Sequence, residues 1–244
     1  MGNFTFGKKL GLPQLALLLI AVNLLVIYYF EIEVSRIVRL GSCLALLSFV
    51  FAKKRFGKSF LSIALIILVV RDVAILFYEE TLFKTISLFC TILVYTLLCL
   101  VIFKKLPTIR FSKTIVLVGL GIVILNIFNV YYLSDIIISS LDNEFQLMLF
   151  FTQSAVMLFM ALFAFLYNES FEGNQSLHML LCVIAFIFSD LGGLAAYFFE
   201  YTPAFYAERS SYLIATVFLV DYIAHYRNAA DQLSEINRGA ISIN

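Results

Sequence analysis

Two aspartates, Asp72 and Asp190, lie deep within long apolar stretches of this sequence and are the side chains best suited to acid/base chemistry. An ionisable side chain in a membrane-spanning helix costs a few kcal/mol, and it normally faces the interior of a helix bundle or a water-filled cavity. A structural hydrogen bond between membrane helices stabilises the bundle by only about 1 kcal/mol or less. Because this stabilisation is smaller than the cost of inserting a carboxylate, we expect both carboxylates to act on protons, in catalysis or in transport.

Other polar side chains occur in neighbouring apolar stretches and predict a pocket to which several helices contribute: Thr91, Asn126 and Gln153. Taken singly, each of them is more often a hydrogen bond between helices than a functional group. Arg71 immediately precedes Asp72 and points about 100° away from it around a helix, so the two need not face one cavity. Arg39 is predicted to be either a cationic partner of a carboxylate or a contact for a phosphate group.

A third carboxylate, Asp221, is followed four residues later by His225, a spacing at which helical side chains meet. The pattern predicts an ion pair near a helix end, with a proton relay as the alternative. His178 begins another apolar stretch and has no Cys, His or carboxylate at metal-ligand spacing beside it. We predict that His178 is an interfacial residue.

The composition requires membrane-spanning helices to position these side chains. Hydrophobic residues make up 62% of the 244 residues, charged residues 14%, and the mean hydropathy is +0.99. These values lie well outside those of water-soluble domains. Because the apolar stretches recur with only short polar gaps, we predict a single transmembrane domain over 1–227 and a short polar cytoplasmic tail over 228–244.

Eight stretches reach the length that a helix needs to cross a bilayer, about 20 mostly apolar residues. We predict an all-α, polytopic membrane bundle of about eight helices, over 14–30, 36–52, 59–78, 84–104, 113–133, 145–168, 176–199 and 207–226. Basic residues concentrate in alternate gaps, led by 8–9, 53–58 and 104–110, which predicts that both termini are cytoplasmic. The expected location is therefore an integral, multi-pass position in a plasma membrane, or in an inner membrane if the source is bacterial.

This topology places the two aspartates at one height in the membrane. Asp72 is 13 residues from the inner end of its stretch and Asp190 is 14 residues from the inner end of its own. At a helical rise of 1.5 Å per residue, both lie roughly 20 Å above that end. We therefore predict that Asp72 and Asp190 meet in the outer half of the membrane.

Several classes of function find no support in the residues. The formal net charge of +1 and the absence of a long basic run argue against a nucleic acid partner. There is no GxSxG, HExxH or GxxxxGK[ST] motif, which disfavours a serine hydrolase, a zinc protease or a P-loop enzyme. The four cysteines lie in apolar stretches without paired spacing, and we predict buried free thiols.

The sequence around the second aspartate resembles the seventh helix of the YhhN-type lysoplasmalogenase family, a family of eight-helix membrane proteins. The resemblance rests on Phe-Ile-Phe-Ser-Asp at 186–190, followed by Leu-Ala at 194–195 and by Phe198. The stretch 212–222 resembles the final helix of that family. Arg-Asp at 71–72 stands where the family has Gly-Asp in its third helix.

This resemblance implies hydrolysis of the vinyl ether bond of a lysoplasmalogen, a lysophospholipid of the bilayer, with release of a fatty aldehyde. Protonation of a vinyl ether carbon gives an oxocarbenium ion that water captures, so Asp72 and Asp190 are assigned jointly to the acid and base work. The residues expected to position water or substrate are Thr91, Asn126, Gln153, Ser189 and, for the lipid phosphate, Arg39. The resemblance implies no metal and no organic cofactor.

Two other functions stay open from the sequence. A proton-coupled transporter of a small molecule would use Asp72 and Asp190 to bind and release protons, although we find no internal repeat and no pair of Gly- or Pro-broken helices. A non-enzymatic lipid-binding or sensory membrane protein would keep the resemblance without the activity. The residues predict no particular oligomeric state.

Overall fold

The computed structural model describes residues 11–53, 60–106, 117, 119–121, 124, 138, 141–171, 173–199 and 201–241, with side chains described up to Ala224 in the last range. The described chain is helical, with α1 Leu12–Tyr29, α2 Ile32–Ala52, α3 Phe60–Leu76, α4 Thr81–Phe103, α6 Glu144–Ser170, α7 Asn174–Tyr197 and α8 Ala204–Ile241. The described positions between 117 and 138 are helical as well. The predicted all-helical bundle is confirmed, while most of the predicted stretch 113–133 lies outside the described residues.

The length and apolarity of the helices are compatible with an integral membrane protein. Among the described residues, α1, α2, α4, α6 and α7 are long and apolar enough to cross a bilayer. Large apolar side chains point outward from these helices, such as Leu17, Phe89 and Phe159, which are 70%, 51% and 57% exposed. Such outward apolar surface would be a liability in water, whereas lipid chains solvate it.

Local sequence explains where several helices begin. Pro13 stands in the first turn of α1, where its missing N–H costs no hydrogen bond. The Asn143 side chain caps α6 by accepting a hydrogen bond from the backbone N–H of Gln146 at 2.9 Å. Pro203 immediately precedes α8. These signals agree with most predicted boundaries to within a few residues.

Two helices extend beyond their predicted bounds. α2 begins at Ile32, so Arg36 lies inside the helix rather than at its start. α8 has 38 residues and continues to Ile241, through most of the stretch predicted as a short polar tail. That stretch contains three Ala together with Gln232, Leu233, Glu235 and Arg238, which are strong helix formers even where no apolar packing is available.

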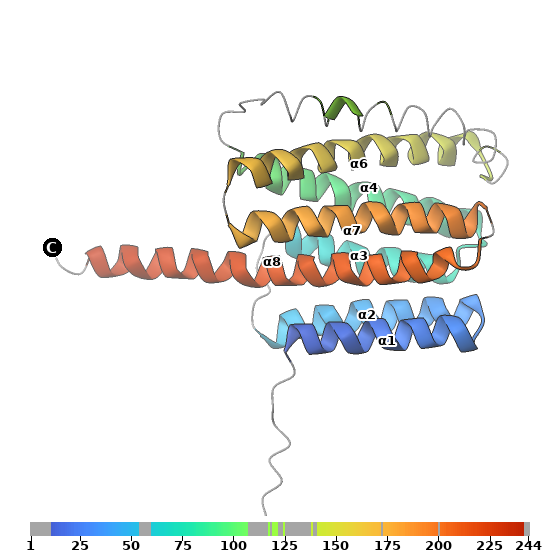
Figure 1. The fold of residues 1–244 in the computed structure, drawn as a ribbon, viewed down its shortest axis with the longest axis horizontal. Helices are drawn as coiled ribbons and strands as arrows, with labels where there is room; N and C mark the ends of the chain where they lie inside the picture. The colour runs from blue at the N-terminus through green and yellow to red at the C-terminus, as the bar shows by residue number, and fades with distance from the viewer. Residues whose placement is uncertain are drawn as a thin grey trace, which may run out of the picture.

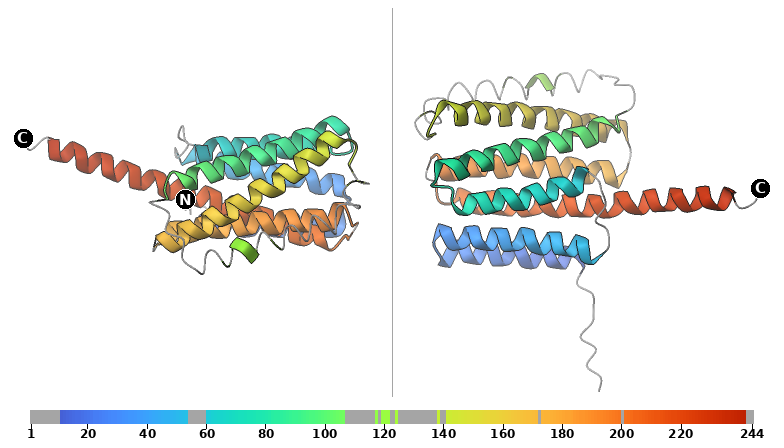
Figure 2. Two further views of the ribbon diagram at one scale, coloured as in Figure 1. Left: turned by 90° about the horizontal axis from the view of Figure 1, so that it is seen from above. Right: turned by 180° about the vertical axis from the view of Figure 1, so that it is seen from behind.

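The helices pack as a closed ring in chain order. Each of α1 to α4 contacts the next, α4 contacts α6, α6 contacts α7, α7 contacts α8, and α8 returns to α1. α8 also contacts α2 and α3, so it lies toward the middle of the bundle (Figure 1, Figure 2). α1 begins and α8 leaves the bundle at the same end (Figure 1).

Buried charge collects at the other end of the bundle, which contains the turn 77–80 and is called the polar end here. The first two turns of α2 and α8 and the last two turns of α3 meet there. They contribute the buried side chains of Arg36, Arg39, Arg71, Asp72, Glu208 and Arg209. An apolar core occupies much of the remaining interior, with residues such as Leu46, Leu98 and Leu219 fully buried.

Candidate functional site

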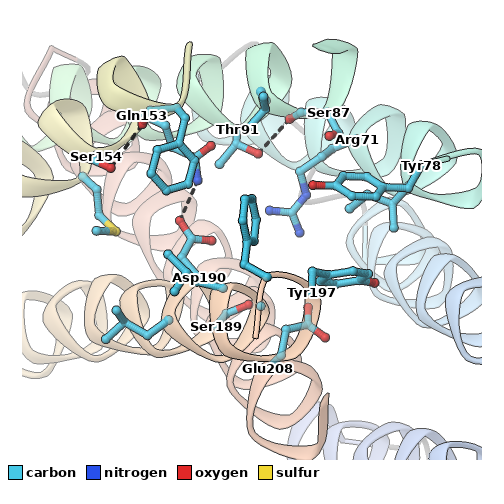
Figure 3. A pocket seen from close by; sticks show the side chains of 18 of the residues that line it. Arg71, Tyr78, Ser87, Thr91, Gln153, Ser154, Ser189, Asp190, Tyr197 and Glu208 are labelled. Atoms are coloured by element: carbon cyan, nitrogen blue, oxygen red, sulfur yellow. Dashed lines mark hydrogen bonds between the residues drawn. The ribbon is translucent and has the colours of Figure 1, made fainter. Parts of the chain in front are cut away.

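A cavity of about 180 Å³ lies near the polar end, among α3, α4, α6 and α7, with single residues from α2 and α8 in its wall. Its lining includes the apolar side chains of Leu88, Phe150, Met157 and Phe198. Polar side chains from several helices also line it, among them Arg71, Thr91, Gln153, Ser189, Asp190 and Glu208 (Figure 3). A cavity with both kinds of lining can hold a ligand that has an apolar part and a polar part.

Asp190 projects from α7 into this cavity and is held by uncharged groups (Figure 3). Its Oδ2 accepts a hydrogen bond from the Tyr95 hydroxyl at 2.7 Å and another from Gln153 Nε2 at 3.0 Å. Within the described part of the chain, Oδ1 receives no hydrogen bond and no cation pairs with the carboxyl group. One carboxyl oxygen is therefore left for a ligand or water.

Asp72 has a different environment, because guanidinium groups surround it. Its Oδ1 lies 3.1 Å from Arg39 Nε and 3.4 Å from Arg71 Nη2. Its Oδ2 accepts a hydrogen bond from the Tyr212 hydroxyl at 2.6 Å. Asp72 is 1% exposed and is not among the described residues that line the cavity. It is a buried counterion, one side chain behind the cavity wall.

Comparisons with family models, curated proteins and solved structures find no match for the chain. The arrangement of its own residues must therefore carry the functional argument. That arrangement contains two aspartates at one end of the bundle, one facing the cavity and one facing cations.

The ion pairs of Asp72 continue into α8. Arg39 Nη1 lies 2.5 Å from Glu208 Oε1, and Arg209 Nε lies 3.2 Å from Glu208 Oε2. Arg209 Nη1 also donates a hydrogen bond to the backbone carbonyl of Ser35 at 3.1 Å. Since α2, α3 and α8 each supply a charge, the network joins these three helices behind the cavity.

A further ion pair contacts two tyrosines of the cavity lining. Arg36 Nη1 donates to Glu79 Oε1 at 2.6 Å, and its guanidinium lies over the rings of Tyr78 and Tyr197, 5.9 Å and 5.7 Å from their centroids. Both tyrosines line the cavity.

Most of the positioning residues predicted from the sequence lie at this cavity. Thr91, Gln153, Ser189 and Arg39 all line it. Of the two roles predicted for Arg39, the pairing with a carboxylate is observed. Asn126 lies outside the described residues.

Several residues of the site were not predicted. Glu208 and Arg209 fall at the start of the predicted stretch 207–226, where charges are common at a helix end, so their burial was missed. No role at the site was predicted for Tyr95 or Tyr212. One signal was available, because Glu208 and Tyr212 are four residues apart and share a helix face.

The opposite end of the bundle gives Asp221 a partner that was not predicted. Asp221 Oδ2 pairs with His178 Nδ1 at 2.7 Å, whereas the partner predicted for Asp221 was His225. His178 lies on α7 and Asp221 on α8, so this pairing gives no signal at short sequence spacing. The His225 side chain lies outside the described residues. The described part of the chain contains no group of three or more His, Cys, Asp or Glu side chains that could hold a metal ion.

Proposed function

We propose that the chain is a membrane-embedded hydrolase of the vinyl ether bond of lysoplasmalogen-type lysophospholipids. The observation that carries the proposal is Asp190, a carboxyl group that faces a cavity lined by apolar side chains and by the guanidinium groups of Arg39 and Arg71. Apolar lining residues suit a single hydrocarbon chain, and a guanidinium suits a phosphate. The resemblance of 186–198 and 212–222 to the YhhN-type family supports the same activity.

In the proposed reaction Asp190 acts first as an acid and then as a base. Its carboxyl O–H gives a proton to the vinyl ether carbon farther from oxygen, which forms a C–H bond and leaves an oxocarbenium ion. Water adds to that ion and returns a proton to the Asp190 carboxylate, giving a hemiacetal. The hemiacetal collapses to the fatty aldehyde and the glycerol hydroxyl, so one water is consumed and the carboxyl group is regenerated.

Gln153 is the neighbour that we assign to the attacking water. Its Nε2 holds Asp190 Oδ2, and its buried Oε1 has no hydrogen-bond partner among the described residues. That oxygen can accept a hydrogen bond from a water beside the carboxyl group. Thr91 and Ser189 present hydroxyl groups in the same cavity.

The two aspartates, predicted from the sequence to share the reaction, are given separate roles in this proposal. Asp190 meets the substrate, whereas Asp72 fixes the guanidinium groups of Arg39 and Arg71. The substrate would come from the bilayer, which the chain crosses several times with both termini cytoplasmic. This orientation is favoured by the Lys and Arg residues between the predicted spans. The membrane is a plasma membrane, or an inner membrane in a bacterium.

The decisive experiment measures aldehyde release from a lysoplasmenyl lipid by the purified full-length chain. Wild type is expected to release aldehyde, and Asp190→Asn to lower the rate by about 100-fold or more, because the proton donor is lost. Asp221→Asn, at the opposite end of the bundle, is the matched control and should keep the wild-type rate. An undiminished rate in Asp190→Asn would refute the site.

The absence of aldehyde from folded wild type would refute the substrate. A lipid that still binds under those conditions would then favour the non-enzymatic lipid-binding alternative.

A further inference from the structure

The cluster of buried charges behind the cavity holds more cations than anions. Arg39, Arg71 and Arg209 supply three guanidinium groups, and Asp72 and Glu208 supply two carboxylates. All five side chains are buried. When Asp190 carries the proton that the first step of the proposed reaction requires, one positive charge is left without a counterion among the described residues.

Arg71 is the member of this cluster that faces the cavity with the weakest pairing. Its contact with Asp72 is 3.4 Å long, and Asp72 Oδ1 is shared with Arg39 at 3.1 Å. Its buried Nε has no hydrogen-bond partner in the described part of the chain. Figure 3 shows the guanidinium directed into the cavity. A buried guanidinium with an unused N–H is a binding group for an anion.

Apart from Asp190, which is protonated in the first step of the proposed reaction, the tyrosine rings and carboxylates of the charged cluster that could bind an ammonium ion are already in contact with arginines. Ammonium groups of lipid headgroups are bound by aromatic faces and carboxylates. The rings of Tyr78 and Tyr197 lie beneath the Arg36 guanidinium. The face of the Tyr212 ring has the guanidinium groups of Arg39 and Arg71 at 4.0 Å and 4.7 Å.

The carboxylates of Glu79, Asp72 and Glu208 are paired with arginines as well. Arg36 binds Glu79, and Arg39 binds both Asp72 and Glu208. A choline or ethanolamine group would therefore enter a region that already holds excess positive charge. A phosphate without an amine would neutralise that excess.

We propose that the cavity selects lysolipids with a net negative headgroup, a phosphate ester without an amine, and that Arg71 binds the phosphate. The inference rests on the proposed function for the protonated state of Asp190 and for the single-chain ligand. It makes the headgroup, and not only the vinyl ether, a determinant of which lipid is accepted.

The test uses saturated alkyl-ether lysolipids, which have no vinyl group to protonate, so binding is measured apart from hydrolysis. Purified full-length chain in a neutral detergent is titrated with lipids of one chain length bearing phosphate, phosphoglycerol or phosphocholine. The two anionic lipids are expected to bind about tenfold or more tightly than the phosphocholine lipid, the effect of one charged hydrogen bond. Equal or tighter binding of the phosphocholine lipid overturns the proposal.

Inorganic phosphate and glycerol phosphate form a second arm, which distinguishes a lipid headgroup from a soluble phosphate ester. If either binds as tightly as the anionic lipids, the ligand is soluble and the lipid part of the proposal is overturned. The failure of aldehyde release alone, with the headgroup preference intact, would refute the reaction and leave the headgroup site standing.

Variants of Arg71 test whether this residue causes the preference for anionic lipids. Arg71→Gln should bring the anionic and phosphocholine lipids to within about twofold of each other, whereas Arg71→Lys should keep most of the preference because it keeps the charge. Lys84→Gln is the matched control, since Lys84 is a cation of the polar end that pairs with Asp142 and is not among the described lining residues. A retained preference in folded Arg71→Gln refutes the assignment of Arg71. If that variant does not fold, the wild-type comparison of headgroups decides the proposal.

Discussion

Asp72 lies between two guanidinium groups and a tyrosine hydroxyl, whereas Asp190 is held by a tyrosine hydroxyl and a side-chain amide. Loss of charge therefore has different effects at the two positions. An asparagine at 190 keeps a carbonyl oxygen that can accept from both neutral donors. An asparagine at 72 leaves buried guanidinium groups without their counterion.

We predict that Asp72→Asn lowers the free energy of unfolding by about 3–5 kcal/mol, the cost of breaking one partner out of a buried ion pair. Asp190→Asn should cost about 1 kcal/mol or less, since its hydrogen bonds are neutral. Thermal unfolding in one detergent measures both variants. Equal destabilisation of the two variants would contradict the assignment of Asp72 as the counterion.

Residue depth could be predicted from the sequence, because the rise per residue of a helix is constant. That rule brought Asp72, Thr91, Gln153 and Asp190 to one end of the bundle. It could not choose their partners, since these depend on how each helix is rotated about its axis. Arg71 illustrates the limit: it was predicted to point away from Asp72, yet its long side chain reaches both the aspartate and the cavity.

At the scale of helices, α7 and α8 approach each other closely where Gly192 faces Glu208. A Cβ atom on Gly192 would lie 2.8 Å from the backbone nitrogen of Glu208 and 2.9 Å from its Cα. Backbone atoms cannot turn aside as a side chain can. The absence of a side chain at 192 thus sets the distance at which α8 presents Glu208 to Arg39.

We expect Gly192→Ala to lower the free energy of unfolding by about 1–3 kcal/mol, the usual cost of overpacking an interior contact. Gly193→Ala provides the matched control, because its Cβ would meet only the Glu208 side chain at an ordinary 3.6 Å. That control should be neutral or stabilising by up to about 1 kcal/mol, the gain in helix propensity. Thermal unfolding measures both, and a neutral Gly192→Ala would show that the helices separate without cost.

The existence and order of the helices were predictable from apolar length alone, and the described helices confirm them. The extension of α2 and α8 at their first turns was not, because it places charged residues inside the bundle against their average preference. Those charges are tolerated because Arg36, Arg39 and Glu208 find partners on other helices. Such partners are set by packing in three dimensions and leave no local pattern.

At the scale of the whole molecule, two ion pairs at the polar end join a cation on a helix to a carboxylate in a loop outside the spanning segments. Lys84 Nζ lies 3.0 Å from Asp142 Oδ1, which connects α4 to the turn before α6. Arg36 binds Glu79 in the turn between α3 and α4. The hydrogen bond from Lys84 lowers the pKa of Asp142, and Arg36 lowers the pKa of Glu79 although partial burial opposes it.

A carboxyl group whose pKa is lowered by folding stabilises the fold above its unfolded pKa, and that contribution is lost as the pH falls through the folded value. We therefore expect the Tm of wild type to decline as the pH falls below about 4. Asp142→Asn should start lower at neutral pH and decline less steeply. Glu169→Gln, at an exposed position of α6, is the control and should follow wild type. A decline in Asp142→Asn as steep as that of wild type would contradict the prediction.

α8 is one continuous helix that connects the cavity wall with the opposite end of the molecule. With 38 residues it is roughly 57 Å long. Its first turns carry Glu208 in the cavity wall, and its last turns stand clear of the bundle at the opposite end (Figure 1). A force on the last turns of α8 acts on the same continuous helix that holds Glu208 against Arg39. Movement of those turns is therefore coupled to the ion pair between Glu208 and Arg39.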